Sequence, residues 1–310
     1  MIQTCIWKGV ESIVLESGAL RIVVLPSQGG HIASMRTASG RELLWQAPGE
    51  SYRLARPGSA FSDGESAGMD DMFPNAAACR LSEGELAGRE LPDHGELWTL
   101  PCSVERCEKN LLVLSAQGQC LPYRIEKTIS LTENSLRIQY YLENTGDAAF
   151  PFLWAAHPLF QAEHFERVEI PGYRGGVTLP YCFGREKASG KLCYPTDRWD
   201  DGTLADLQKI PEKEAGVGYK FMTDAKNGQG LCILKGKPGR ENVYVTVPAA
   251  TIPYLGVWVD ACSDREVPAY VVAPEPSNHV SVTMEKCPSI LQPCERFTWW
   301  IQYTVENRGD

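Results

Sequence analysis

The chain has 310 residues, 43% of them hydrophobic, which is enough to bury one large all-β core or two ordinary ones. We expect a single domain over residues 1–310. A formal net charge of −9 at pH 7 argues against nucleic acid or an anionic membrane as a partner, because no basic stripe exists to neutralise phosphates.

The targeting and cysteine signals favour a soluble, cytoplasmic protein. The first residues contain no basic segment followed by a long apolar one, and no run approaches the roughly 18 apolar residues that a membrane helix needs. The eleven cysteines are odd in number, scattered, and without a Cys-x-x-Cys pair. We therefore expect reduced thiols, and neither a disulfide framework nor a zinc site.

The first recognisable pattern is alternation with period two. Residues 12–16 and 19–25 flank Ser17-Gly18 and predict a hairpin, and residues 31–37 are expected to pair with 42–46 across a turn at 38–40. The chain therefore begins as a β meander. His31 starts one of these strands, and a lone histidine there is more often structural than functional.

Residues 50–98 lose this alternation and are rich in Gly, Pro, Ser and acid. A connection of this length is usually disordered or functional, and its apolar residues indicate that it packs, so we expect a system of binding loops. His94 lies between two carboxylates in Pro92-Asp93-His94-Gly95-Glu96. Both His94 and Arg80 are candidate ligand contacts, with a solvated turn as the alternative.

The clearest strands are residues 123–131 and 136–142, which alternate regularly about a turn at 132–135. The chain then enters FPFLWAAHPLF, residues 150–160, which reads as a buried strand with His157 directly before a proline. That position favours extended geometry and a rigid imidazole. His157 is either a catalytic group or a core histidine, whereas Trp154 should point to the opposite face, into the core.

The last part of the chain returns to strands after a polar stretch. Residues 161–230 offer only short helical possibilities at 163–168 and 204–210, and His164 should lie on the surface. Strands are predicted at residues 230–235, 242–247, 254–260, 270–273 and 297–305. Because no βαβ alternation and no phosphate-binding glycine loop occurs, we predict an all-β fold, a large antiparallel β-sandwich.

Two stretches in this last part carry candidate site residues. Glu275 lies between Pro274 and Pro276, where low conformational freedom suits a catalytic base, although an edge-strand glutamate in a turn fits the same spacing. Trp258 and Asp260 lie in PYLGVWVDACSD, and the indole could stack on a sugar or pack in the core.

The order of several motifs resembles the aldose 1-epimerase (galactose mutarotase) family over about the whole chain. They are GGHIASM with RELLW, DMFPN with PDHGELW, FLWAAHPLF, and PYLGVWVD with APEPSN. The resemblance implies a galactose mutarotase-like supersandwich. It also implies an isomerase that interconverts the α and β anomers of an aldohexose such as glucose or galactose, with no cofactor and no metal.

The resemblance also suggests roles for single residues. Glu275 resembles the family's general base and His157 its general acid. His94 resembles a second histidine that binds and polarises the sugar, and Arg80 an arginine that contacts sugar hydroxyls. Asp260 and Asp71 are candidates for the family's hydroxyl-binding aspartate, which has no matched counterpart here.

The chemistry asks for such groups independently of the resemblance. Mutarotation removes the proton of the anomeric hydroxyl and protonates the ring oxygen, and one base and one acid suffice. The chain departs from galactose mutarotases at PDHGELW and at AAACRL, so the sugar stays open, as does the choice between monomer and homodimer. A non-catalytic carbohydrate-binding or sensor protein, a hexose-phosphate epimerase and a carbohydrate-cleaving enzyme are the alternatives.

Overall fold

The computed structural model of the chain describes residues 3–264, 268–284, 287 and 289–307. These residues form antiparallel β-sheets, and their helical structure is limited to four short 3-10 turns. The turns are η1 (Phe61–Asp63), η2 (Leu97–Thr99), η3 (Ala162–His164) and η4 (Lys213–Ala215). The predicted all-β antiparallel architecture is thereby confirmed.

The chain divides into two compact units. The first comprises Met1–His157 with Ser281–Ile301, and the second comprises Pro158–Val280 with Gln302–Asp310. The single domain over residues 1–310 stays a prediction.

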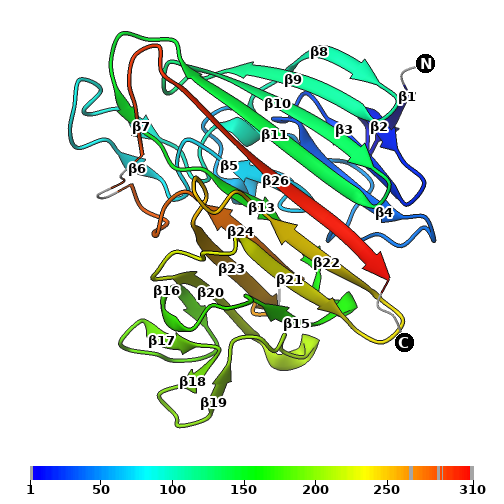
Figure 1. Cartoon of the computed structure of the whole chain (residues 1–310), viewed down its shortest axis with the longest axis vertical. Helices are drawn as coiled ribbons and strands as arrows, with labels where there is room; N and C mark the ends of the chain where they lie inside the picture. Colours follow the sequence, from blue (N-terminus) through cyan, green and yellow to red (C-terminus); the bar gives the residue numbers. More distant parts are fainter. Residues whose placement is uncertain (1–2, 265–267, 285–286, 288, 308–310) are drawn as a thin grey trace. The chain divides into compact units, whose positions relative to one another are not determined.

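The first unit contains two runs of strands in hydrogen-bonded order, β1-β2-β3-β4-β5-β13 and β11-β10-β9-β8 (Figure 1). Their bounds are β1 (Gln3–Trp7), β2 (Val10–Glu16), β3 (Leu20–Leu25), β4 (His31–Thr37), β5 (Met69–Met72), β8 (Ser103–Glu108), β9 (Leu111–Gln117), β10 (Tyr123–Thr132), β11 (Ser135–Asn144) and β13 (Ala155–Pro158). Two short pairs complete the unit: β6 (Cys79–Arg80) with β7 (Glu90–Leu91), and β12 (Phe150–Pro151) with β25 (Ile290–Leu291).

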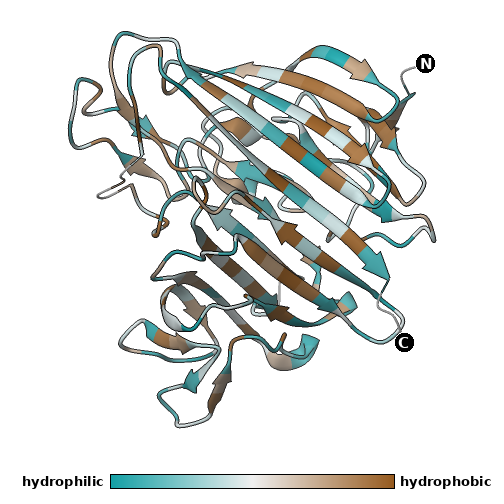
Figure 2. Ribbon diagram, viewed as in Figure 1, coloured by the Kyte–Doolittle hydropathy of each residue, from teal (hydrophilic) through white to brown (hydrophobic). Residues whose placement is uncertain are grey.

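The two runs of the first unit face each other through a buried polar cluster on Asp71. The Asp71 carboxylate from β5 lies 2.7 Å from the Lys127 ammonium of β10. It also accepts hydrogen bonds from the Tyr140 hydroxyl of β11 at 2.6 Å and from the Trp154 indole at 2.9 Å. Buried and partly exposed residues alternate along β10 and β11, and Figure 2 shows the matching alternation of hydrophobic and hydrophilic residues on these strands.

The second unit also contains two runs of hydrogen-bonded strands. One run has the order β24-β23-β20-β16-β17 with β14 also on β24, and the other is β15-β21-β22 with residues 302–307 of β26. The bounds are β14 (Phe160–Gln161), β15 (Phe165–Glu169), β16 (Gly175–Phe183), β17 (Lys191–Tyr194), β20 (Val217–Thr223), β21 (Leu231–Gly236), β22 (Glu241–Thr246), β23 (Tyr254–Ala261), β24 (Tyr270–Ser277) and β26 (Arg296–Asn307). A separate pair is formed by β18 (Thr196–Arg198) and β19 (Leu204–Asp206).

Most of the predicted strands are confirmed, and several other predictions are wrong. Residues 42–46 form only a bridge from Glu42 to Arg36 instead of a strand. The helices predicted at 163–168 and 204–210 are wrong, since β15 pairs with β21 and β19 pairs with β18. His164 is buried, not on the surface.

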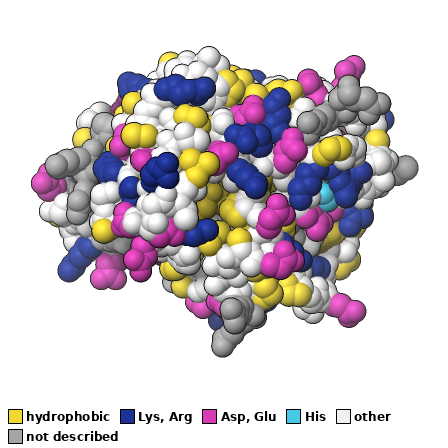
Figure 3. Space-filling model, turned by 90° about the horizontal axis from the view of Figure 1, so that it is seen from below, with side chains coloured by type: hydrophobic (Ala, Val, Ile, Leu, Met, Phe, Trp, Pro, Cys, Tyr) yellow, Lys and Arg dark blue, Asp and Glu magenta, His cyan; other side chains and the backbone are white. Residues whose placement is uncertain are grey.

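The surface mixes charges of both signs. In the view of Figure 3, Lys and Arg side chains are interspersed with Asp and Glu, and hydrophobic side chains lie among them. All eleven cysteines carry free thiols. Among the described residues there is no helix of the length and apolar character that crossing a membrane requires.

Candidate functional site

His94 is held in a turn whose backbone leaves it little freedom. Its φ of +60° lies in the left-handed region, which is unusual for a residue other than glycine. The His94 N–H donates to the Ala76 carbonyl at 2.6 Å. The buried amide of Asn75 donates to the Pro92 carbonyl at 2.7 Å, so the turn is anchored on both sides.

Gly95 and Glu96 fix the other end of this turn. A Cβ on Gly95 would lie 2.1 Å from the Phe73 carbonyl oxygen, so this close approach and the φ of +69° both require glycine. The Glu96 carboxylate is buried and accepts the N–H groups of Gln119 and Cys120 at 3.0 and 2.9 Å. Of the two carboxylates that flank His94 in the sequence, Glu96 is therefore committed to the backbone.

Asp93 is the carboxylate that contacts the histidine. Its Oδ2 lies 3.0 Å from Nδ1 of His94. The close contact with His94 lowers the pKa of Asp93, and partial burial opposes that effect. Asp93 is thus ionised at neutral pH and lies against the Nδ1 side of the His94 ring.

His157 meets His94 in an aromatic cluster within the first unit. The two imidazole rings lie edge to face with centroids 5.2 Å apart. Phe61 stacks on His94 at 4.2 Å and presents its edge to His157 at 4.9 Å. Phe61 comes from the turn η1, and nothing in its sequence surroundings distinguished it from other loop aromatics.

The segment that carries His157 differs from the single strand that was predicted. It forms β12 and β13, with residues 152–154 between them. Here the Phe152 N–H donates to the Ser289 carbonyl and the Leu153 N–H donates to the Pro74 carbonyl. Two adjacent residues therefore bond to two different segments of the chain, and the strand is interrupted. His157 itself lies in β13 with 6% of its surface exposed. This burial agrees with the expectation of a rigid imidazole.

Arg80 lies apart from this cluster. Its side chain is exposed, and its Nε donates to the Gly88 carbonyl at 2.9 Å within the hairpin that β6 and β7 form. No contact of Arg80 with either histidine occurs among the residues that the structure describes. Its predicted role toward sugar hydroxyls stays a prediction.

In the second unit, one sheet face carries the three remaining predicted site residues. Glu275 of β24 pairs with Gly256 of β23, and Trp258 and Asp260 follow at intervals of two along β23. Residues spaced by two on a strand, and residues directly opposite on neighbouring strands, share a face. Glu275, Trp258 and Asp260 therefore project from the same side of the sheet.

Glu275 belongs to the interior of this sheet, which rules out the edge-strand alternative. Strand β24 continues through Pro274 and Pro276 to Ser277 and pairs with β23 along its whole length, while β14 pairs on its other side. Only 2% of the Glu275 surface is exposed.

Lys220 is a further polar residue of this face, and the sequence did not single it out. Its Nζ forms a close ion pair with Oε2 of Glu275, and 7% of its surface is exposed. Lys220 lies on β20 directly opposite Trp258, which puts it on the same face as Glu275. A lysine inside the otherwise apolar strand VGYKFMT was the available signal, because a buried lysine needs a partner.

Trp258 and Asp260 have distinct surroundings on this face. The Trp258 ring lies edge to face with exposed Phe183 of β16, with centroids 6.4 Å apart. Asp260 accepts the Ser263 N–H at 2.8 Å. Burial raises the pKa of Asp260, and the hydrogen bonds from Ser263 oppose that shift.

Asp71 is not available for a sugar. The Lys127, Tyr140 and Trp154 contacts described above occupy both of its oxygens. Among the two aspartates considered for hydroxyl binding, Asp260 remains the candidate.

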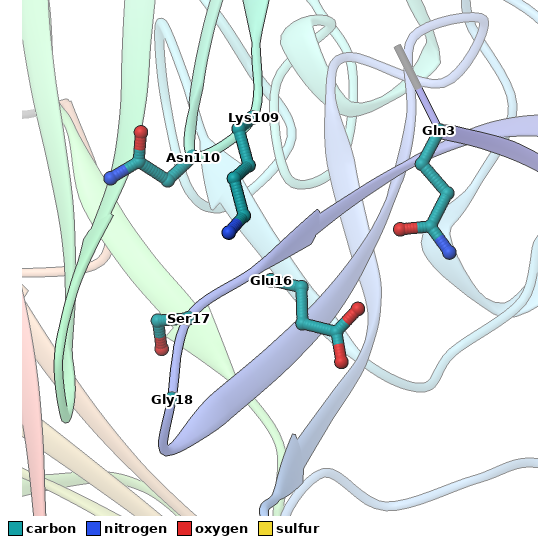
Figure 4. A pocket seen from close by; sticks show the side chains of 6 residues that line it. All are labelled: Gln3, Glu16, Ser17, Gly18, Lys109 and Asn110. Atoms are coloured by element: carbon teal, nitrogen blue, oxygen red, sulfur yellow. The ribbon is translucent and has the colours of Figure 1, made fainter. Parts of the chain in front are cut away.

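A surface hollow of about 470 Å³ lies elsewhere in the first unit (Figure 4). Lys109 and Asn110 line it together with Gln3 and the turn Glu16 to Gly18. It contains no residue of the predicted site, and its lining mixes one acid, one base and amides without a buried polar anchor.

The fold places the chain among the large antiparallel β-sandwiches of the galactose mutarotase-like kind. The aldose 1-epimerase family model matches residues 11–179, more than half of the chain, and the chain belongs to this family. The match includes Arg80, His94 and His157. Glu275, Trp258 and Asp260 lie beyond the matched residues.

Solved structures extend the likeness of the fold over nearly the whole chain. A putative aldose 1-epimerase from Escherichia coli K12 is 17% identical, with a TM-score of 0.64, covering 95% of this chain and 98% of that one. A galactose mutarotase related enzyme from Lactobacillus acidophilus is 15% identical, with a TM-score of 0.66 and coverages of 96% and 98%. A galactose mutarotase-like protein from Clostridium acetobutylicum is 15% identical, with a TM-score of 0.65 and 99% coverage of both chains. No curated protein matches the chain in sequence.

Proposed function

We propose that the chain is an aldose 1-epimerase that interconverts the α and β anomers of a neutral aldohexose such as glucose or galactose. The single observation that carries the proposal is membership of the aldose 1-epimerase family across the residues that hold His94 and His157. The contact between these two imidazoles, with Phe61 against both, supports it further.

The proposed roles follow from protonation. Glu275 accepts the proton of the anomeric hydroxyl, since a carboxylate is ionised at neutral pH, and His157 as an imidazolium donates a proton to the ring oxygen. The ring opens to the aldehyde, which rotates and recloses on its other face with the two roles reversed. His94, with Asp93 against its Nδ1 side, binds and polarises the sugar.

The surroundings of the other groups bear on binding. Arg80 is proposed to reach sugar hydroxyls from its exposed hairpin, while Trp258 offers an aromatic surface and Asp260 a carboxylate on the face that holds Glu275. Acid and base alone complete the reaction, so we propose that it needs neither cofactor nor metal. The free thiols favour a reducing compartment such as the cytoplasm, and the protein acts as a monomer or homodimer.

The test is polarimetry of freshly dissolved α-glucose and α-galactose, corrected for spontaneous mutarotation. Glu275→Gln keeps the size of the side chain and removes the base, so turnover should fall roughly a hundredfold or more with little change in KM. His157→Asn should do the same from the acid side, and the pH profile of the native protein should be a bell. His94→Asn should raise KM as well.

A Glu275→Gln variant that matched the native protein on every aldose it binds would make the carboxylate structural. The non-catalytic sugar-binding alternative would then take the place of the proposed enzyme. Circular dichroism of each variant serves as the folding control.

A further inference from the structure

The buried ammonium of Lys220 has no role in the acid–base scheme. It carries three N–H donors, and the described residues supply it with one acceptor, the carboxylate of Glu275. Only 9% of the Lys220 side chain is exposed. The two remaining N–H groups can therefore donate to an oxygen that does not belong to the described residues.

The neighbours of the ion pair on the sheet face set the surroundings of the ammonium. Gly256 separates Glu275 from Met222 in the register of β24, β23 and β20. A Cβ at Gly256 would lie 2.7 Å from the Met222 sulfur and 3.5 Å from the Glu275 Cβ. Trp258 flanks Lys220 on the same face. The ion pair is thus bordered by the Met222 thioether above Gly256 on one side and by the Trp258 indole on the other.

The charge of the pair decides which oxygen fits. The carboxylate of Glu275 already balances the ammonium of Lys220, so a second anion would meet no net positive charge. A neutral hydroxyl oxygen accepts a hydrogen bond from the ammonium without adding charge. Two neighbouring hydroxyls of a pyranose match an ammonium and a carboxylate in contact, one as acceptor and one as donor.

We propose that Lys220 binds the substrate directly by donating a hydrogen bond to its 2-hydroxyl oxygen, while Glu275 accepts the proton of the adjacent anomeric hydroxyl. This assignment rests on the proposed function. Lys220 keeps all its protons throughout, and the proton that leaves the anomeric oxygen passes to Glu275. The substrate class is therefore an aldose with a free 2-hydroxyl, and a 2-amino sugar is disfavoured because its ammonium would face Lys220.

The experiment compares glucose, 2-deoxyglucose and 6-deoxyglucose on the native protein and on Lys220→Met. The native protein should lose about tenfold to a hundredfold in kcat/KM on 2-deoxyglucose, the usual worth of a hydrogen bond to a charged group. Lys220→Met should lower kcat/KM on glucose and bring the ratio of glucose to 2-deoxyglucose close to one. The ratio of glucose to 6-deoxyglucose should not change.

Two further variants distinguish direct contact of Lys220 with the substrate from a role in which Lys220 only supports Glu275. Lys220→Arg keeps the charge and the donors, so it should retain part of the preference for the 2-hydroxyl. Lys191→Met makes the same change at an exposed lysine that pairs with Asp224, and it should leave every ratio unchanged. The contrary outcome is that Lys220→Met lowers kcat/KM equally on all three sugars and leaves the ratio of glucose to 2-deoxyglucose at its native value. In that case Lys220 would only support Glu275, and the proposal would be wrong.

Failure of the proposed function gives a different result. A native protein that accelerates no aldose contradicts the enzyme, and equilibrium binding of glucose and 2-deoxyglucose, followed by NMR, then tests Lys220 by itself. Tighter binding of glucose that disappears in Lys220→Met supports the contact. Equal dissociation constants for the two sugars on the native protein overturn it.

Discussion

Asp71 and Asp260 are both aspartates in apolar strand surroundings, yet their partners give them different roles. Asp71 pairs with a buried ammonium and accepts two further hydrogen bonds, so its charge is balanced inside the core. Asp260 accepts hydrogen bonds from Ser263, and burial raises its pKa. An aspartate whose burial raises its pKa is a better candidate for contact with a ligand than one whose two oxygens both have protein partners.

Asp260→Asn tests that reading through stability. Because the pKa of folded Asp260 lies above its unfolded value of about 3.9, the native state binds more protons than the unfolded state between those values. As the pH falls through that window, the native protein should become more stable relative to the variant, so its free energy of unfolding should rise compared with that of the variant. At pH 7 the variant should be at least as stable. Urea unfolding from pH 7 to about 3.5 measures the difference, and a variant clearly weaker at pH 7 would count against the raised pKa.

Single residues of the site differ in how far the sequence could reveal them. His94, His157 and Glu275 are chemically distinctive and lie in recognisable motifs. Phe61 is one loop aromatic among several, and its position against both histidines depends on long-range packing of η1. Lys220 lies in a strand that is buried along its whole length, and its partner Glu275 is 55 residues later in the chain.

At the scale of elements, the turn that carries His94 depends on glycine at position 95. Gly95→Ala would place a methyl group 2.1 Å from the Phe73 carbonyl oxygen and would strain a φ of +69°. We expect a loss of about 3 kcal/mol or more in the free energy of unfolding, together with lower turnover as His94 moves.

Gly58→Ala is the matched control for that change. Gly58 also has a positive φ, +86°, but a Cβ there meets nothing within 4 Å. In this variant the free energy of unfolding should fall by only about 1–2 kcal/mol, the cost of a positive φ for a residue with a Cβ. Chemical denaturation of both variants gives the comparison, and equal losses would show that the Phe73 contact contributes nothing.

Alternation predicted β10 and β11, but it missed β9, which also alternates, and β20. Strands β10 and β11 expose every second residue and were found with their turn. Strand β20 is buried at all seven positions, so its sequence shows no period of two. The inward-pointing Lys127 of β10 was passed over because its partner Asp71 lies in a loop-like stretch with little regular pattern.

At the scale of the whole molecule, net charge decides which sugars the protein should attract. The chain carries −9, and both signs are mixed over the face shown in Figure 3. A neutral aldose feels little of this field, whereas the dianion of a hexose phosphate is repelled at long range. The response to salt therefore separates the proposed aldose 1-epimerase from the hexose-phosphate alternative.

The last prediction concerns that response. Raising the ionic strength from about 0.01 M to about 1 M shortens the Debye length from roughly 30 Å to roughly 3 Å. For glucose or galactose, kcat/KM should change by less than about twofold over this range, because a neutral substrate has no charge to screen. A hexose 6-phosphate should be the poorer substrate at low salt and should improve as repulsion is screened. Preferred turnover of the phosphate at low salt would instead require a local cationic site strong enough to overcome the net charge, and it would favour a hexose-phosphate epimerase.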